Sequence, residues 1–184
     1  PSKRPVRGIL QYITRGDTVP EELIRTNGCD ILDAEQEFSD IARYYNKPTG
    51  AGNRTYYHMI VSYNTTYEKI SPEEVRDMVK DLCQRTKIDC YQWYLAVHTD
   101  RPDHMHAHVV INNVSYRGDR KQHVKAGKSF QSTGKLRHEL MEKGNVICKE
   151  HGYEHSLVNT KSKAQERLTR AELALAAKGE ISWK

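Results

Sequence analysis

The chain has 184 residues and carries 29 lysines and arginines against 24 aspartates and glutamates, a formal net charge of +5. This length is typical of one domain and allows a sizeable core, so we expect a single domain over residues 1–184, the N-terminal part of a longer protein. No apolar stretch is long enough to span a membrane, and no signal peptide is visible. The four cysteines lack C-x-x-C spacing, which favours reduced thiols and a cytoplasmic location.

Hydrophobic periodicity predicts helices and strands that alternate along the chain. The expected elements are a helix over Ile9–Arg15 (a strand also fits), a helix that ends before Pro48, a strand over Thr55–Tyr63, a helix that begins at Ser71, two central strands over Tyr91–His98 and His104–Val114, a helix that ends at Gly152, and a short helix between Thr169 and Gly179. Two adjacent antiparallel strands with helices on one face fit the α+β class.

Two helix starts carry capping signals. Asp33 with Gln36 fits a capping box at the start of the second helix. Ser71 followed by Pro72, with Glu74 three residues after the serine, fits an N-cap, a proline at the first helical position and a second capping box.

The most informative stretch contains four histidines within eleven residues, at positions 98, 104, 106 and 108. Alternate residues of a strand share one face, so His104, His106 and His108 are expected to point the same way. A hairpin through residues 101–103 returns the chain over His98. Three imidazoles without a fourth protein ligand leave coordination positions open, which suits a catalytic metal. The alternative is a chance cluster of solvated or core histidines.

The pattern His98-x-Asp100, His106-x-His108 and then Asn112 resembles the third motif of conjugative relaxases of the MobP type, in the HUH endonuclease superfamily. The resemblance makes His98, His106 and His108 the metal ligands. The gap between His98 and His106 is one residue longer than usual, so His104 remains an alternative ligand. His58 and Asn112 are expected to support the site.

The resemblance continues near the N-terminus, where Gly8–Ile13 is similar to the first motif of the family and makes Tyr12 the nucleophile. A tyrosine hydroxyl is a weak nucleophile at neutral pH and needs a base or a polarising metal beside it. Asp100 is expected to orient an imidazole or to accept the tyrosine proton. The competing tyrosines are Tyr44, Tyr45, Tyr56, Tyr57 and Tyr63, of which Tyr45, Tyr57 and Tyr63 fit packing positions.

The resemblance implies a mostly antiparallel five-stranded sheet flanked by helices, with a divalent metal at its centre. Manganese or magnesium is the expected ion, with zinc, nickel or cobalt as possible occupants. The implied activity is nicking and rejoining of single-stranded DNA at an origin of transfer, through a 5′-phosphotyrosyl intermediate. Implied partners in the bacterial donor cell are an accessory DNA-binding protein and a type IV coupling protein. Three alternatives remain open: a rolling-circle replication initiator, a zinc-dependent phosphoesterase and a non-catalytic DNA-binding module.

Between Ser115 and His138 the charge is strongly positive, with seven basic residues against Asp119 alone, a net of +6. The basic residues are Arg117, Arg120, Lys121, Lys125, Lys128, Lys135 and Arg137. Interspersed glycines and serines predict a mobile loop that binds DNA phosphates. A solvated loop without a ligand is the alternative.

Overall fold

The computed structural model describes residues 5–15, 19–48, 52–65, 68–100, 104–154 and 156–158. The short helix expected between Thr169 and Gly179 lies outside these residues.

A four-stranded sheet in the order β1-β3-β4-β2 forms the middle of the described part, and every neighbouring pair is antiparallel. Its strands are β1 (Ile24–Asn27), β2 (Tyr56–Ser62), β3 (Tyr91–His98) and β4 (His106–Ser115). The two expected central strands are therefore confirmed, and so is the α+β class. The described residues supply four strands where the resemblance implied five.

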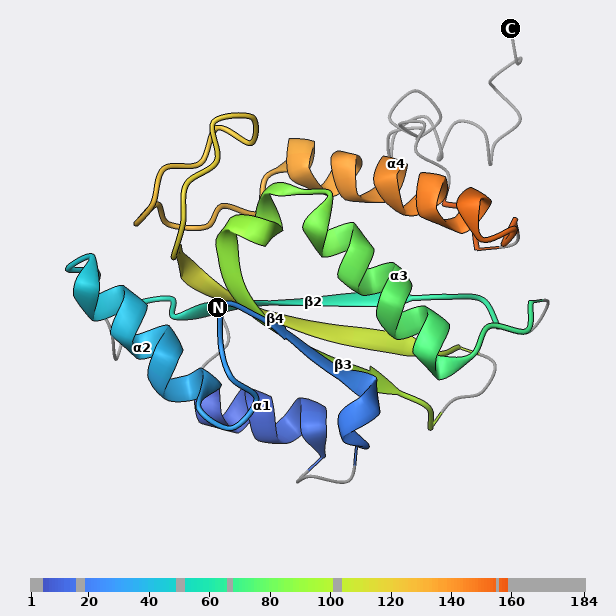
Figure 1. The fold of residues 1–184 in the computed structure, drawn as a ribbon, viewed down its shortest axis with the longest axis horizontal. Helices are drawn as coiled ribbons and strands as arrows, with labels where there is room; N and C mark the ends of the chain where they lie inside the picture. The colour runs from blue at the N-terminus through green and yellow to red at the C-terminus, as the bar shows by residue number, and fades with distance from the viewer. Residues whose placement is uncertain are drawn as a thin grey trace, which may run out of the picture.

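Helices cover both faces of this sheet, so the expectation of helices on one face was wrong. The helices are α1 (Val6–Thr14) and α2 (Ala34–Tyr44) on one face, and α3 (Pro72–Gln84) and α4 (Gly134–Glu150) on the other (Figure 1). Two short 3-10 turns, Glu21–Leu23 and Lys87–Cys90, precede β1 and β3. Among the described residues, no helix has the length and apolar character that crossing a membrane requires.

Strand alternation divides the hydrophobic residues between two cores. The larger core lies under α3 and α4 and takes Trp93, Leu95 and Val109 from the central strands. The buried stripe of α3 packs there, and each of its side chains is at most 3% exposed: Val75, Met78, Val79 and Leu82. The smaller core joins α1 and α2 to the other face of the sheet, where β3 and β4 contribute Tyr94 and Val110. Residues on β3 and β4 that point toward α1 and α2 therefore belong to this separate, smaller core.

Of the two predicted capping boxes, one is confirmed and one was wrong. Ser71 accepts a hydrogen bond from the Glu74 backbone, and the Glu74 side chain accepts one from the Ser71 backbone. Asp33 precedes α2 but its side chain makes no capping bond. Two other carboxylates near this helix start accept backbone N–H groups: Glu37 from Asp30 at 2.7 Å and Asp30 from Leu32 at 2.8 Å.

Asn112 forms buried hydrogen bonds to elements that surround the smaller core. Its side chain is 1% exposed, and its amide donates to the Phe38 carbonyl at 3.2 Å and to Gln92 Oε1 at 2.8 Å. Its own oxygen accepts from the backbone N–H of Val114. Asn112 therefore links α2, β3 and β4.

Replacing Asn112 by alanine is expected to lower the free energy of unfolding by about 2–3 kcal/mol, because it leaves buried polar partners unsatisfied. Urea denaturation of the variant measures this loss. The neighbouring Asn113→Ala is the matched control, since Asn113 is only partly buried. Equal stability of the two variants would contradict the structural role given to Asn112.

Candidate metal centre

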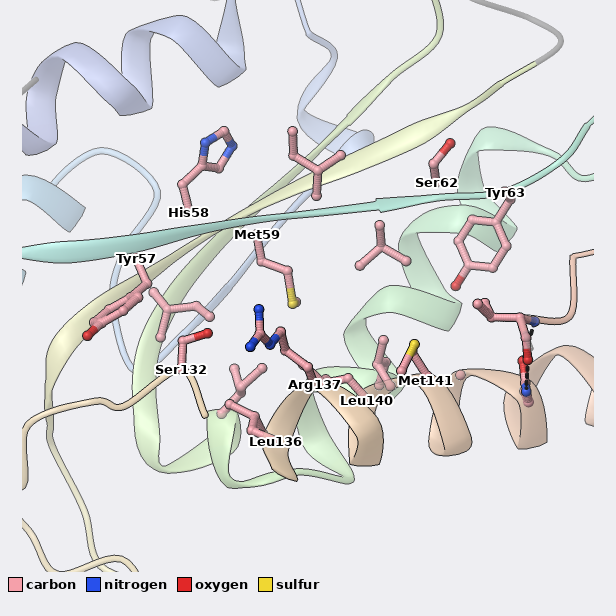
Figure 2. A pocket seen from close by; sticks show the side chains of 18 of the residues that line it. Tyr57, His58, Met59, Ser62, Tyr63, Ser132, Leu136, Arg137, Leu140 and Met141 are labelled. Atoms are coloured by element: carbon pink, nitrogen blue, oxygen red, sulfur yellow. Dashed lines mark hydrogen bonds between the residues drawn. The ribbon is translucent and has the colours of Figure 1, made fainter. Parts of the chain in front are cut away.

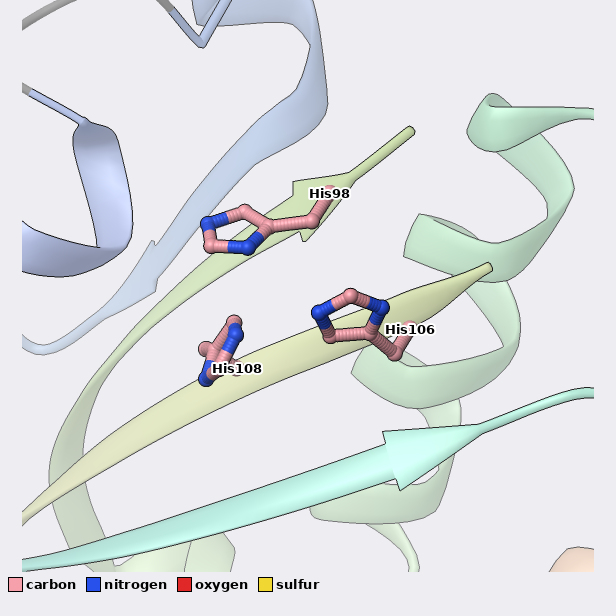
Figure 3. A group of neighbouring side chains, drawn as sticks. All are labelled: His98, His106 and His108. Carbon is pink, nitrogen blue, oxygen red and sulfur yellow. The ribbon is translucent and has the colours of Figure 1, made fainter. Parts of the chain in front are cut away.

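The pairing of β3 with β4 brings three histidines together. His98 lies directly opposite His106, and His108 lies opposite Ala96, so all three side chains share the face that α1 covers. Each imidazole offers one nitrogen, and these nitrogens lie within 4.8 Å of one another. Figure 3 shows the three rings gathered on one side of the two strands. The predicted return of the chain over His98 is confirmed by this register, although residues 101–103 lie outside the described part.

Backbone carbonyls hold two of these rings by their second nitrogen. His98 Nε2 lies 2.7 Å from the carbonyl oxygen of Ile13, and His106 Nδ1 lies 3.2 Å from the carbonyl oxygen of His104. A carbonyl oxygen only accepts hydrogen bonds, so both of these nitrogens carry the proton. The lone pairs left for a metal are therefore on His98 Nδ1 and His106 Nε2.

His58 occupies the corresponding position for His108. Its Nε2 lies 2.7 Å from His108 Nδ1, and the two rings are within 19° of parallel. For His108 to present Nε2 to a metal, its Nδ1 must donate to His58. The structure thus places His58, on the neighbouring strand β2, behind a ligand and outside the group of three.

Burial favours the uncharged form of two of the three rings, His98 and His108. His98 and His108 are each 3% exposed. Burial is the main cause that lowers the pKa of His108 to about 3, with the neighbouring His98 adding to it, and burial also lowers the pKa of His98. Neutral imidazoles at pH 7 are the form that binds a metal. The group can therefore hold a divalent ion and leave coordination positions open for a substrate.

The alternative ligand His104 and the predicted supporting residue Asn112 lie away from this group. His104 is exposed just before β4, and it contributes its backbone carbonyl to His106. Asn112 lies four residues beyond His108 on the same strand and bonds Phe38 and Gln92 instead. Neither side chain belongs to the group of three histidines found in the described residues.

Tyr12 lies beside the histidines. It is on α1 and 48% exposed, and its ring centroid is 5.8 Å from that of His108, with the rings edge to face. Tyr57 and Tyr63 pack against the larger core on the other face of the sheet. Tyr44 and Tyr45 contact each other at the end of α2.

Arg15 is a site residue that the sequence reasoning missed. Its Nη2 lies 2.8 Å from Asp100 Oδ2 and 3.2 Å from His98 Nδ1. The hydrogen bond from Arg15 is the main cause that lowers the pKa of Asp100. Asp100 thus faces the imidazole group with Arg15 between them. The one sequence signal was position: Arg15 follows Tyr12 by three residues and ends α1.

The basic segment lies at the far end of β4 from the histidines. His108 is near the start of β4 and Ser115 is its last residue, a separation of about 23 Å at the usual strand rise. Hydrogen bonds close the loop, including those from Ser115 Oγ to the Lys125 carbonyl and between Asp119 and Val124. Lys135 and Arg137 belong to α4 and not to the loop.

Two basic residues of this segment have partners within the protein. Arg117 pairs with Asp89, and the ammonium of Lys128 donates to the His123 carbonyl. Arg120, Lys121 and Lys125 are exposed. Lys128 is exposed as well, and its bond to a neutral carbonyl leaves its charge in place, so the exposed positive charge of the loop lies on these three residues and Lys128.

A largely apolar cavity of about 460 Å³ lies on the opposite face of the sheet, between β2 and α4. Figure 2 shows Tyr57 and Met59 pointing into it and His58 pointing away from it. The sheet therefore separates this cavity from the histidine group.

Comparison with known proteins places this geometry in a family. The family model for the MobA/VirD2-like relaxase nuclease domain matches residues 12–153. Two curated relatives, both Protein rlx of Staphylococcus aureus, are 28% and 29% identical over 156 and 157 residues, which is 85% of this chain. The chain spans less than half of those relatives, 42% and 44% of their lengths. With Tyr12, the three histidines and both central strands inside the matched region, the chain belongs to the MobA/VirD2-like relaxases and contains their nuclease domain.

Proposed function

We propose that this domain nicks one strand of DNA at an origin of transfer and later rejoins it, by transesterification through Tyr12. The observation that carries the proposal is the contact between Tyr12 and the imidazole group, with the two ring centroids 5.8 Å apart. A nucleophile needs to lie beside the group that polarises its target. Family membership supports DNA as the substrate.

In this mechanism the Tyr12 oxygen attacks the scissile phosphorus in line. The bond to the 3′ oxygen breaks, so the products are a 5′-phosphotyrosyl enzyme and a free 3′-hydroxyl. The phosphotyrosine is itself a phosphodiester, so attack by a 3′-hydroxyl reverses the step and rejoins a strand. We assign the Tyr12 proton to Asp100, which is ionised at neutral pH and pairs with Arg15, three residues after Tyr12. The protonated Asp100 then gives this proton to the leaving 3′ oxygen, which departs as the hydroxyl.

His98, His106 and His108 would hold a divalent ion, with manganese or magnesium the proposed physiological metals. A bound cation there supplies charge stabilisation at a non-bridging phosphate oxygen. The protein's contribution is orientation. The carbonyls of Ile13 and His104 and the ring of His58 fix which nitrogen each ligand presents.

The first prediction tests the nucleophile. Tyr12→Phe is expected to abolish cleavage of an origin oligonucleotide and leave the fold intact, because only an exposed hydroxyl is removed. A denaturing gel with labelled single-stranded DNA and manganese measures the covalent adduct. Tyr44→Phe, at another exposed tyrosine, is the matched control and should form the adduct normally. Peptide mapping that finds phosphotyrosine at any position other than Tyr12 would refute the assignment.

The second prediction tests the ligand set. His106→Ala is expected to weaken manganese binding on the order of 100-fold or more, because it leaves two ligands. His104→Ala is the matched control, two residues away, and should keep near-normal affinity because only its carbonyl serves the site. Calorimetric titration without DNA measures both. Loss of the ion in His104→Ala, with retention in His98→Ala, would exchange the roles of these two residues.

The third prediction tests the basic loop as a phosphate-binding surface. Removal of one phosphate contact lowers the salt dependence of single-strand binding by about 0.7. Neutralising Arg120, Lys121 and Lys125 together should therefore flatten log K against log salt by up to about 2. Fluorescence anisotropy at several salt concentrations measures the slope.

The control for the loop removes three charges elsewhere on the surface. Its substitutions to glutamine are at Lys69, Lys80 and Lys149. The control should leave the slope unchanged. If the loop variant also keeps the wild-type slope, the loop is a solvated connection and does not contact the bound strand.

A further inference from the structure

We propose that Arg15 is a phosphate-binding residue of this site and that it becomes available for the phosphate only when a metal replaces it at His98. The inference rests on the proposed function for the identity of the phosphate, which belongs to the DNA strand. The replacement itself rests on the geometry around His98 alone.

The first observation is that Arg15 occupies the metal-facing nitrogen of His98. His98 Nε2 donates to the Ile13 carbonyl, so Nδ1 is the nitrogen with a lone pair, and Arg15 Nη2 donates to that lone pair at 3.2 Å. One lone pair cannot serve a guanidinium and a metal ion together. Metal ligation by His98 therefore requires the guanidinium to leave Nδ1.

The second observation is that Asp100 keeps Arg15 at the site when it leaves His98. The ion pair joins Arg15 Nη2 to Asp100 Oδ2 at 2.8 Å, and both side chains are about 40% exposed, at 41% and 39%. An exposed, tethered guanidinium beside the nucleophile can reach a phosphate arriving from solvent. Arginine suits this task because its planar donors match phosphate oxygens in pairs.

The third observation concerns the backbone. Arg15 is the C-cap residue of α1, and its backbone is left-handed, with φ 51° and ψ 44°. Its backbone N–H donates to the carbonyls of Gln11 and Tyr12. Glycine adopts this conformation without a steric penalty, whereas arginine does not. From this turn the Arg15 side chain reaches His98, one of the three histidines that Tyr12 lies beside. A strained residue whose side chain enters the site fits a functional role better than a helix end chosen for stability.

The replacement is tested by calorimetric titration with manganese in the absence of DNA. Arg15→Met removes the competing donor and should raise manganese affinity about tenfold, the usual weight of one hydrogen bond to a charged group. Arg7→Met, at an exposed arginine of the same helix, is the control and should leave the affinity unchanged. The gain should persist in 1 M salt, where charge repulsion at a distance is screened within about 3 Å. Unchanged or weaker binding by Arg15→Met would overturn the competition, and a gain that vanishes in salt would reduce it to remote repulsion.

The phosphate contact is tested by the salt dependence of oligonucleotide binding, measured with and without manganese. With manganese, Arg15→Met should flatten the slope by about 0.7 relative to wild type, the weight of one phosphate contact on a single strand. Without manganese the two proteins should give the same slope, because Arg15 is then held by His98. The coupling would be refuted if wild type and Arg15→Met gave equal slopes with and without manganese. It would also be refuted if their slopes differed by the same amount in both conditions. Failure of the wild type to bind single-stranded DNA would instead refute the proposed function and leave the manganese result standing.

Discussion

The antiparallel register of β3 on β4 is the constraint on which the site depends. It sets His98 opposite His106 and Ala96 opposite His108, so one ligand from β3 meets two from β4 on a single face. Because side chains alternate between faces, a slip of one residue would turn His98 into the larger core and separate it from the other two. Burial of Leu95, Val97 and Val109 on the opposite face opposes such a slip, since each would have to leave the larger core for the face that α1 and α2 cover. The larger core therefore stabilises the arrangement of the three histidines from the opposite face of the sheet.

The same strands fix the chemical form of the ligands. Each of the three imidazoles has one nitrogen hydrogen-bonded to the protein, to the Ile13 carbonyl, the His104 carbonyl or His58. Burial disfavours the charged form of the two most enclosed rings, His98 and His108. Each of the three imidazoles offers one nitrogen to the group, and within the described part of the chain no carboxylate belongs to it. A metal held this way keeps its full positive charge for a phosphate, whereas carboxylate ligands would offset part of it.

The sequence predicted the parts of this site that rest on local periodicity and missed those that rest on tertiary contacts. The H-x-H spacing predicted a shared strand face, and the Ser71 capping box is as expected. Strand β1 was not predicted from the sequence. It has only four residues, at the edge of the sheet, and alternation of buried and exposed residues cannot be detected over so short a segment. Arg15 was not predicted as a site residue because its partners, His98 and Asp100, are more than 80 residues away in the sequence. The capping box at Asp33 failed for a local reason: Asp33 has φ −107° and ψ 6°, outside the extended conformation that N-cap residues usually adopt.

The placement of the basic loop constrains how a DNA strand can lie on this domain. The loop leaves β4 at the end opposite the histidines, and Gly127 packs there against the ring of Tyr45, which caps α2. The helix α2, beside the basic loop, and the histidines share one face of the sheet. A DNA strand that touched both the loop and the histidines would therefore run along that face for about 23 Å. The scissile phosphate would then lie at one end of the bound stretch, beside Tyr12. Cleavage and phosphate anchoring would be separate in space, so the anchored segment could stay bound while the 3′-hydroxyl end departs and is replaced.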